Sequence, residues 1–143
     1  GLEAVHREYS LPVIFPMHPR TRKMVEQFGI SLDGISAMNP VGFLEFLQLE
    51  SNARLVLTDS GGVQEETCIL GVPCVTLREN TERPETIEVG GNVLAGTGAE
   101  QILASARQML SRTGSWENPY GDGMAGRMIV TICNGIPSRN NCR

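Results

Sequence analysis

The sequence predicts an α/β fold, in which a doubly wound parallel β-sheet carries helices on both faces. Five short apolar segments, rich in β-forming residues, alternate with helix-like segments at spacings of roughly twenty residues. These apolar runs are nearly continuous, which is typical of parallel strands buried on both faces. The chain has 143 residues, a length that fits one domain.

Glycine and proline residues divide the chain into these elements. Gly29 and Gly71 each follow a helix-like segment, where a left-handed residue ends a helix. Thr97 and Glu100 form an expected capping box for the next helix, and Pro84 is expected at a first helical position. The expected strands span 12–15, 35–38, 54–58, 73–77 and 92–95. Four of the expected helices span 1–8, 21–28, 42–50 and 63–70. Three more are a helix that starts at 84, a helix that includes 102–110, and a helix over 124–133.

Composition places the chain among globular proteins. Hydrophobic residues make up 41% and charged residues 20%, which suits a packed core rather than disorder. The net charge of −4 provides no fold-wide basic field, so nucleic acid is not an expected partner. No apolar run reaches the ~20 residues that span a bilayer. No secretory signal opens the chain, so we expect no membrane partner and a cytoplasmic location.

The cysteine and histidine pattern gives no sign of a metal centre. The four cysteines form no C-x-x-C pair, and the two histidines are not spaced beside them as metal ligands. We therefore expect buried or incidental thiols in a reducing compartment, and no metal site. The residues concerned are Cys68, Cys74, Cys133, Cys142, His6 and His18.

The two ends of the chain carry separate expectations. The chain opens at Gly1 in an amphipathic helical segment with no capping residue before it, which indicates a segment upstream. Residues 134–143 are polar and without periodicity, so we expect a disordered tail. The folded domain is therefore expected to cover residues 1–133 and to be incomplete at its N-terminus.

The turn after the third expected strand is the strongest candidate for ligand binding. Ligands of doubly wound sheets bind beyond the carboxyl ends of strands, and here Asp59-Ser60-Gly61-Gly62 leads directly into a helix. The two glycines let a ligand approach the backbone closely, and the N–H groups of a helix start attract phosphate. Ser60 caps the helix or binds the anion. An ordinary capped turn explains the same residues.

Four further side chains are candidate ligand contacts, and three of them also have a plainer explanation. Glu66 offers a carboxylate acceptor to ribose hydroxyls, although a solvated helix face explains it too. His18 follows a strand and is suited to a phosphate or a carboxylate, although a lone histidine is more often structural. Arg83 precedes Pro84 and is suited to bidentate phosphate binding. Phe46 lies on an apolar helical face, either as a core residue or as a platform for a base.

Several common nucleotide and catalytic motifs do not occur. The sequence contains neither G-x-G-x-x-G nor G-x-x-x-x-G-K-[ST]. Loop positions suggest no Ser-His-Asp arrangement, and no carboxylate pair stands out for glycoside hydrolysis. The residues by themselves therefore leave phosphate binding as a hypothesis and assign no reaction.

Four segments, in order, resemble the motifs of the non-hydrolysing UDP-N-acetylglucosamine 2-epimerase family. Residues 57–66, Leu-Thr-Asp-Ser-Gly-Gly-Val-Gln-Glu-Glu, are similar to its hallmark, and 81–85, Thr-Glu-Arg-Pro-Glu, to its arginine motif. Residues 118–123, Asn-Pro-Tyr-Gly-Asp-Gly, resemble its C-terminal signature, and 15–19, Phe-Pro-Met-His-Pro, resemble its histidine loop. Together these segments cover nearly the whole chain.

The resemblance implies the C-terminal half of a GT-B arrangement, in which two Rossmann-like domains face each other across a cleft. It implies that this half grips the UDP of a UDP-N-acetylhexosamine, with Ser60, Gly61 and Gly62 on the diphosphate. Glu66 is then expected on the ribose hydroxyls, and Arg83 on the nucleotide. The remaining implied contacts are Phe46 against the uracil, the Val41 backbone at the edge of the base, and His18 lining the cleft.

The family reaction eliminates UDP across the sugar C1–C2 bond and adds it back with C2 inverted, without a metal or redox cofactor. The resemblance implies that UDP-N-acetylglucosamine and UDP-N-acetylmannosamine are interconverted, for cell-envelope polysaccharide synthesis, by a homodimer at full length. The family's acid and base residues belong to its N-terminal domain. We therefore expect no catalytic residue in this chain and no activity from the chain alone.

The same resemblance predicts that the first strand of the domain is missing. The family's Thr-x-His-Arg-x-Glu-Asn segment, which follows that strand, does not occur here. The first strand lies in the middle of a sheet of order 3-2-1-4-5-6. The chain is thus expected to hold strands two to six of this order, with a gap between two and four, and to be poorly stable or to close its sheet differently.

Two alternative functions remain open from the sequence. A GT-B glycosyltransferase shares the same way of binding a donor, although residues 64–66 and 82–85 favour the epimerase. A nucleotide-sugar binding module without catalysis suits a chain that lacks the acid and base residues. Activity of the full-length gene product would distinguish these alternatives.

Overall fold

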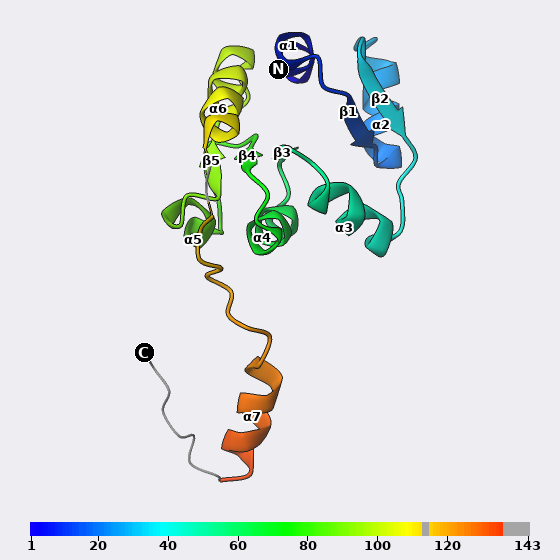
Figure 1. Ribbon diagram of the computed structural model, residues 1–143. Coiled ribbons are helices and arrows are strands. Elements are labelled where there is room, and N and C mark those ends of the chain that lie inside the picture. Colours follow the sequence, from blue (N-terminus) through cyan, green and yellow to red (C-terminus); the bar gives the residue numbers. More distant parts are fainter. Residues whose placement is uncertain (113–114, 136–143) are drawn as a thin grey trace.

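The computed structural model describes residues 1–112 and 115–135, in which strands and helices alternate as expected (Figure 1). The strands are β1 (Val13–Pro16), β2 (Ile35–Met38), β3 (Val56–Thr58), β4 (Cys74–Thr76) and β5 (Asn92–Leu94). The helices are α1 (Leu2–Tyr9), α2 (Pro19–Gln27), α3 (Phe43–Ser51), α4 (Gly61–Leu70), α5 (Pro84–Glu88), α6 (Ala99–Ser111) and α7 (Ala125–Cys133). The α/β class is confirmed.

The strands form two separate parallel sheets. β1 pairs with β2, with Val13 opposite Ile35, and β4 lies between β3 and β5. In the order 3-2-1-4-5-6, the second and fourth strands are joined only through the first. β1 and β3 occupy those two places and form no ladder with each other. The expected gap between the second and fourth strands is confirmed.

The core lies between the β3–β5 sheet and the helices α1 and α6. Both α6 and α4 contact this sheet, and Figure 1 places α6 on one side of it and α4 and α5 on the other. Arg107 of α6 donates to Glu8 of α1 through Nε and Nη2, at 2.6 and 2.5 Å. The positions that α6 contributes recur at helical spacing. The buried cluster consists of Val5, Val75, Ala95, Ile102, Ala106 and Met109.

The β1–β2 sheet is less buried than the sequence predicts. Every residue of β4 is buried, whereas β1 and β2 have none, and Ile14 is half exposed. The α2 helix that accompanies these two strands also has no buried residue. The expectation of strands buried on both faces is therefore right for β4 and wrong for β1 and β2. Neither β1 nor β2 contributes to the main buried cluster, since the two sheets do not join.

The helix ends agree with the glycine pattern but not with the expected capping box. Gly29 and Gly71 have φ values of 59° and 72°, in the left-handed region that ends a helix. The N-cap of α6 is Gly98, which makes no side-chain capping bond. Because α6 begins one residue later than a Thr97 cap requires, Glu100 is the second helical residue, and the capping box is wrong. Glu100 still complements the helix dipole from the first turn.

Replacement of Gly71 by alanine tests the end of α4. A Cβ in the left-handed region costs roughly 1–2 kcal/mol, and no atom lies within 4 Å of the added Cβ to complicate that cost. We expect Gly71→Ala to lower the free energy of unfolding by about 1 kcal/mol in urea denaturation. The matched control is Gly62→Ala in the first turn of the same helix, where φ is not positive. An equal loss in both variants would contradict this account.

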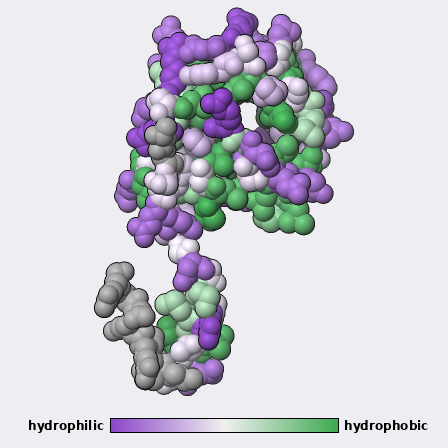
Figure 2. Space-filling model, viewed as in Figure 1, coloured by the Kyte–Doolittle hydropathy of each residue, from purple (hydrophilic) through white to green (hydrophobic). Residues whose placement is uncertain are grey.

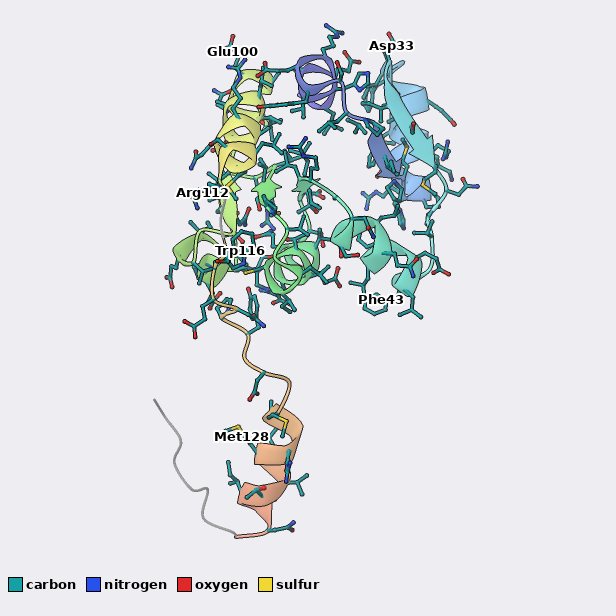
Figure 3. All side chains as sticks on the ribbon, viewed as in Figure 1. Asp33, Phe43, Glu100, Arg112, Trp116 and Met128 are labelled. Carbon is teal, nitrogen blue, oxygen red and sulfur yellow. The ribbon has the colours of Figure 1, made fainter. Side chains whose placement is uncertain are left out.

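The C-terminal part of the chain leaves the body of the molecule after Trp116 (Figure 3). The Trp116 Nε1 donates to the Cys68 carbonyl at 2.9 Å, and a Cβ added to Gly91 would lie 2.8 Å from the indole ring. Beyond this anchor, α7 extends away from the sheets and has no buried residue (Figure 1). From residue 136 onward, the expected disordered tail lies outside the described residues.

Candidate functional site

The turn between β3 and α4 places a capped helix N-terminus at the carboxyl end of a strand. Ser60 has an extended backbone, and its Oγ accepts from the Val63 N–H at 3.5 Å. The Thr58 hydroxyl accepts from the Ser60 N–H at 3.0 Å and fixes the turn. The helix begins at Gly61, two residues before the expected start at 63. The positive end of the α4 dipole therefore lies at this turn.

Gly61 is the point at which a second loop approaches the turn. A Cβ added to Gly61 would lie 3.3 Å from Glu82 Oε1 and 3.8 Å from Arg83 Cζ. The nearest atom to a Cβ on Gly62 is the Ser60 Oγ, at 3.9 Å. Neither glycine has a positive φ. The side-chain ends of Glu82 and Arg83, in the loop between β4 and α5 that is called the arginine loop below, therefore lie close to Gly61, while Gly62 leaves open space above the helix start.

Arg83 brings a cation to the same place. It is the N-cap residue of α5, and its guanidinium forms an ion pair with Glu65 of α4. Its Nη1 also donates to the Glu82 carbonyl at 3.0 Å. The guanidinium is thus held beside Gly61, with its side chain one-third exposed. A planar donor fork beside a helix N-terminus is an arrangement suited to phosphate.

A buried polar network connects the two loops. Gln64 is fully buried, and its Nε2 donates to the Ser60 carbonyl while its Oε1 accepts from the Thr81 hydroxyl at 2.5 Å. Thr81 Oγ1 in turn accepts from the Arg83 N–H at 3.0 Å. Asn92 of β5 donates to Gln64 Oε1 at 3.3 Å. The positions of the serine turn and the arginine loop are therefore coupled through satisfied buried hydrogen bonds.

The network continues from β5 into the start of α5. Asn92 Nδ2 donates to the Thr86 hydroxyl at 3.0 Å, and its Oδ1 accepts from Thr76 of β4 at 2.9 Å. The Thr86 hydroxyl donates to the Arg83 carbonyl at 2.8 Å. Asn92, Thr86 and Thr76 are all buried. The Arg83 backbone is therefore held from two sides, by Thr81 and by Thr86.

The loop at 118–123 reaches the same area from the C-terminal part of the chain. Asn118 Oδ1 accepts from the Tyr120 N–H at 2.9 Å, which makes a tight turn. Burial is the largest cause that raises the pKa of Tyr120 above its ordinary value, and Glu65 adds to this while Arg83 opposes it. The Tyr120 hydroxyl has no hydrogen-bond partner among the described residues. Tyr120 is therefore a neighbour of the Arg83–Glu65 pair.

A cavity of about 1210 Å³ opens between the two sheets, next to the serine turn. Figure 2 shows the body of the molecule hollowed through in its upper part. Strands β1 and β3, whose facing edges have no ladder partner, both line this cavity. Four of the expected site residues line it, namely His18, Val41, Phe46 and Ser60. The other four, Gly61, Gly62, Glu66 and Arg83, do not belong to its lining.

His18 has a structural role at the edge of this cavity. It is the N-cap residue of α2, and its Nδ1 accepts from the Arg20 N–H at 3.2 Å. An Nδ1 that accepts leaves the Nε2 of a neutral imidazole as the donor nitrogen. The hydrogen bond to Arg20 therefore supports the plainer explanation, that His18 is a structural residue.

Sequence reasoning missed several residues of this area. Gln64 belongs to the hallmark segment but was not a candidate site residue, and nothing in the sequence indicates that it meets Thr81 or Asn92. Glu50 was also missed, and it lines the cavity as the one buried residue of α3. A signal for Glu50 exists, since residues 43, 46, 47 and 50 share a helical face and a carboxylate interrupts the apolar run.

The family profile for UDP-N-acetylglucosamine 2-epimerase matches residues 1–134. The chain belongs to this family. Within the described residues, no helix is long and apolar enough to cross a membrane.

Relatives and solved structures agree with this assignment. The UDP-N-acetylglucosamine 2-epimerase of Methanococcus maripaludis is 53% identical over 94% of this chain and 38% of its own length. The UDP-2,3-diacetamido-2,3-dideoxy-D-glucuronate 2-epimerase of Pseudomonas aeruginosa is 44% identical over 83% of this chain and 34% of its own length. The crystal structure of the Methanocaldococcus jannaschii UDP-GlcNAc 2-epimerase in complex with UDP-GlcNAc and UDP has a TM-score of 0.84 and 48% identity, covering 94% of this chain and 39% of that one. The chain therefore spans about two fifths of the length of such epimerases.

Proposed function

We propose that this chain is the UDP-binding part of an enzyme that interconverts UDP-N-acetylglucosamine and UDP-N-acetylmannosamine. The observation that carries the proposal is the position of the Arg83 guanidinium beside Gly61 at the N-terminus of α4, where its Cζ would lie 3.8 Å from an added Cβ. A cation and a helix start converge there on one open space, as a diphosphate requires. Family membership supports UDP as the nucleotide and favours an epimerase over a GT-B glycosyltransferase.

Each side chain then has a role that its position supports. Ser60, with the backbone N–H groups of Gly61 and Gly62, holds the diphosphate, and Arg83 neutralises its charge. Glu66 accepts hydrogen bonds from the ribose hydroxyls from within the same helix.

The base has its own place in the cavity. Phe46 offers its ring to the uracil, and the Val41 backbone meets the edge of the base, since both residues line the cavity next to Ser60. His18 is a further lining residue of the cleft, with Nε2 as its free donor.

The reaction proposed for the whole enzyme makes UDP retention part of the chemistry. Elimination breaks the bond between the sugar C1 and the UDP oxygen, a proton leaves C2, and re-addition restores both bonds with C2 inverted. UDP must stay bound between the two steps, and the helix start and Arg83 stabilise its negative charge throughout. The acid and base are proposed to come from the part of the enzyme that this chain does not span, so the chain alone is expected to be inactive.

Further proposals concern the whole protein. Residues 1–133 form the UDP-binding domain of a two-domain GT-B enzyme that acts in the cytoplasm as a homodimer. No metal or redox cofactor takes part in this scheme. A binding module without catalysis remains the alternative for the chain in isolation. Its site residues are proposed to bind the nucleotide, and none of them is proposed as a catalytic acid or base.

Calorimetric titration of the chain with UDP tests the proposal. We expect saturable binding by the native chain and loss of binding in the Ser60→Ala, Arg83→Ala double variant, because both anion contacts are removed. ADP serves as the matched ligand, and weaker binding of ADP is expected since Phe46 and Val41 are proposed to recognise uracil. Equal heats from the native chain and the double variant, with both folded by circular dichroism, would contradict the site.

A further inference from the structure

Glu50 is a buried acid at the C-terminal end of α3. The residue is 3% exposed, and neither carboxylate oxygen accepts a hydrogen bond from an N–H or hydroxyl donor among the described residues. The ion pairs of the described part of the chain do not include it. A buried carboxylate without a donor or a cation is costly. The surroundings of Glu50 therefore favour its neutral, protonated form.

Glu66 of α4 is the group that faces Glu50. The helices α3 and α4 pack together, and Glu66 is the residue whose hydrogen bonding and charge both act on the Glu50 carboxyl. Two ionised carboxylates are both acceptors, so such a bond forms only when one of them carries a proton. Burial, followed by the charge of Glu66 and the contact with it, raises the pKa of Glu50 to about 7. The proton of the pair is therefore expected on Glu50.

Within residues 1–112 and 115–135, Cys74 is the other titratable group that interacts with Glu50. Burial raises the pKa of the Cys74 thiol of β4 to about 12. The charge of Glu50 makes a smaller contribution in the same direction. Cys74 is thus neutral throughout the pH range in which Glu50 ionises. Glu66 is therefore the neighbour whose charge affects the protonation of the Glu50 carboxyl.

The pair lies directly behind the proposed nucleotide contacts. Glu50 follows Phe46 by one helical turn, so both point to the same face of α3, and both line the cavity together with Ser60. Glu66 is one and a half turns into the helix that Ser60 caps. Glu50 therefore lines the cavity and is coupled to Glu66, the residue proposed to bind the ribose.

We propose that Glu50 is a positioning residue for Glu66, in that protonated Glu50 donates a hydrogen bond to one oxygen of the Glu66 carboxylate. The other oxygen is then held in place to accept from the ribose. The inference rests on the proposed UDP site. Ionised Glu50 cannot donate and repels Glu66, so nucleotide affinity declines as the pH rises through the range in which Glu50 loses its proton.

Calorimetric titration with UDP at pH 6 and pH 8.5 tests this role in three proteins: the native chain, Glu50→Gln and Glu50→Leu. Because the terminal phosphate of UDP itself loses a proton near pH 6, the readout is the affinity ratio of the native chain to Glu50→Gln at each pH. Glutamine donates at every pH, so this ratio is expected to be near one at pH 6 and to fall by about threefold to tenfold at pH 8.5. Glu50→Leu removes the donor and is expected to bind more weakly than Glu50→Gln at both pH values.

The ribose gives a readout that a purely structural role would not change. We expect the preference for UDP over 2′-deoxy-UDP to be kept in Glu50→Gln and to shrink in Glu50→Leu. An unchanged ratio across pH, or an unchanged preference in Glu50→Leu, would overturn the inference while leaving the UDP site intact.

A measurement without nucleotide separates this inference from the proposed function. In ¹³C-labelled chain, the Glu50 side-chain carboxyl is expected to titrate near neutral pH, and Glu66→Gln is expected to shift that titration to lower pH. If this coupling is seen but UDP does not bind, the proposed function fails while the carboxyl pair stands. A Glu50 carboxyl that titrates in the usual range of glutamate would overturn the pair itself.

Discussion

Arg83→Ala is expected to weaken UDP binding by roughly 10- to 100-fold, the amount associated with losing charge-assisted hydrogen bonds to a phosphate. The variant also leaves the Glu65 carboxylate without its ion-pair partner, beside the proposed diphosphate position. Uridine, which has no phosphate, should lose much less affinity than UDP. Isothermal titration of both ligands measures this difference directly.

Two control variants test whether the loss of affinity in Arg83→Ala comes from the guanidinium at this position. Arg83→Lys keeps the charge but loses the planar fork, so an intermediate affinity is expected. Arg107→Ala removes an arginine from another ion pair, the one with Glu8 on the far side of the β3–β5 sheet, and should leave UDP affinity unchanged. If UDP and uridine lost affinity equally in Arg83→Ala, the arginine would act through the fold and not through the diphosphate.

Met109→Ala is expected to lower the free energy of unfolding by about 2–5 kcal/mol, because it leaves a cavity in the core. Met109 is fully buried in the cluster that joins α6 to α1 and β4. Urea denaturation followed by circular dichroism measures the loss. A domain has only about 5–15 kcal/mol to lose, and the sheets of this chain do not join, so the variant is expected to be near the limit of folding.

Met128→Ala is the matched control for this prediction. Met128 lies on α7, away from the sheets (Figure 3), and is 57% exposed. Removal of its side chain should change the stability by no more than about 0.5 kcal/mol. Similar losses at Met109 and Met128 would mean that the cluster on α6 is not the centre of the folding core.

Much of the fold could be predicted because its signals are local. The alternation of apolar runs with helical segments placed all five strands, and Gly29 and Gly71 marked helix ends by a backbone conformation that glycine adopts freely. Ser60 was recognisable as a cap from its place between a strand and a helix. Each of these features depends on a few neighbouring residues. The capping box at Thr97 failed by a single residue, since small shifts in a helix start carry little local penalty.

The candidate site was only partly predictable. The serine turn and Arg83 followed from motifs, but the position of the Arg83 guanidinium beside Gly61 belongs to the tertiary structure. Gln64 bonds to Thr81 and to Asn92, which lie 17 and 28 residues further along the chain. No local pattern encodes such distances. The burial of Glu50 was likewise invisible, although its place on an apolar helical face was a usable signal.

The sequence by itself determined the order and type of the elements, the helix caps and the motif residues of the family. The tertiary structure decided that Arg83 lies beside Gly61, that Gln64 bonds to Asn92, and that Glu50 is buried. It also decided that the β1–β2 sheet stays partly exposed beside a cavity. The reason is physical: backbone preferences act over a few residues, whereas burial and hydrogen bonding between distant side chains arise only when the strands and helices pack.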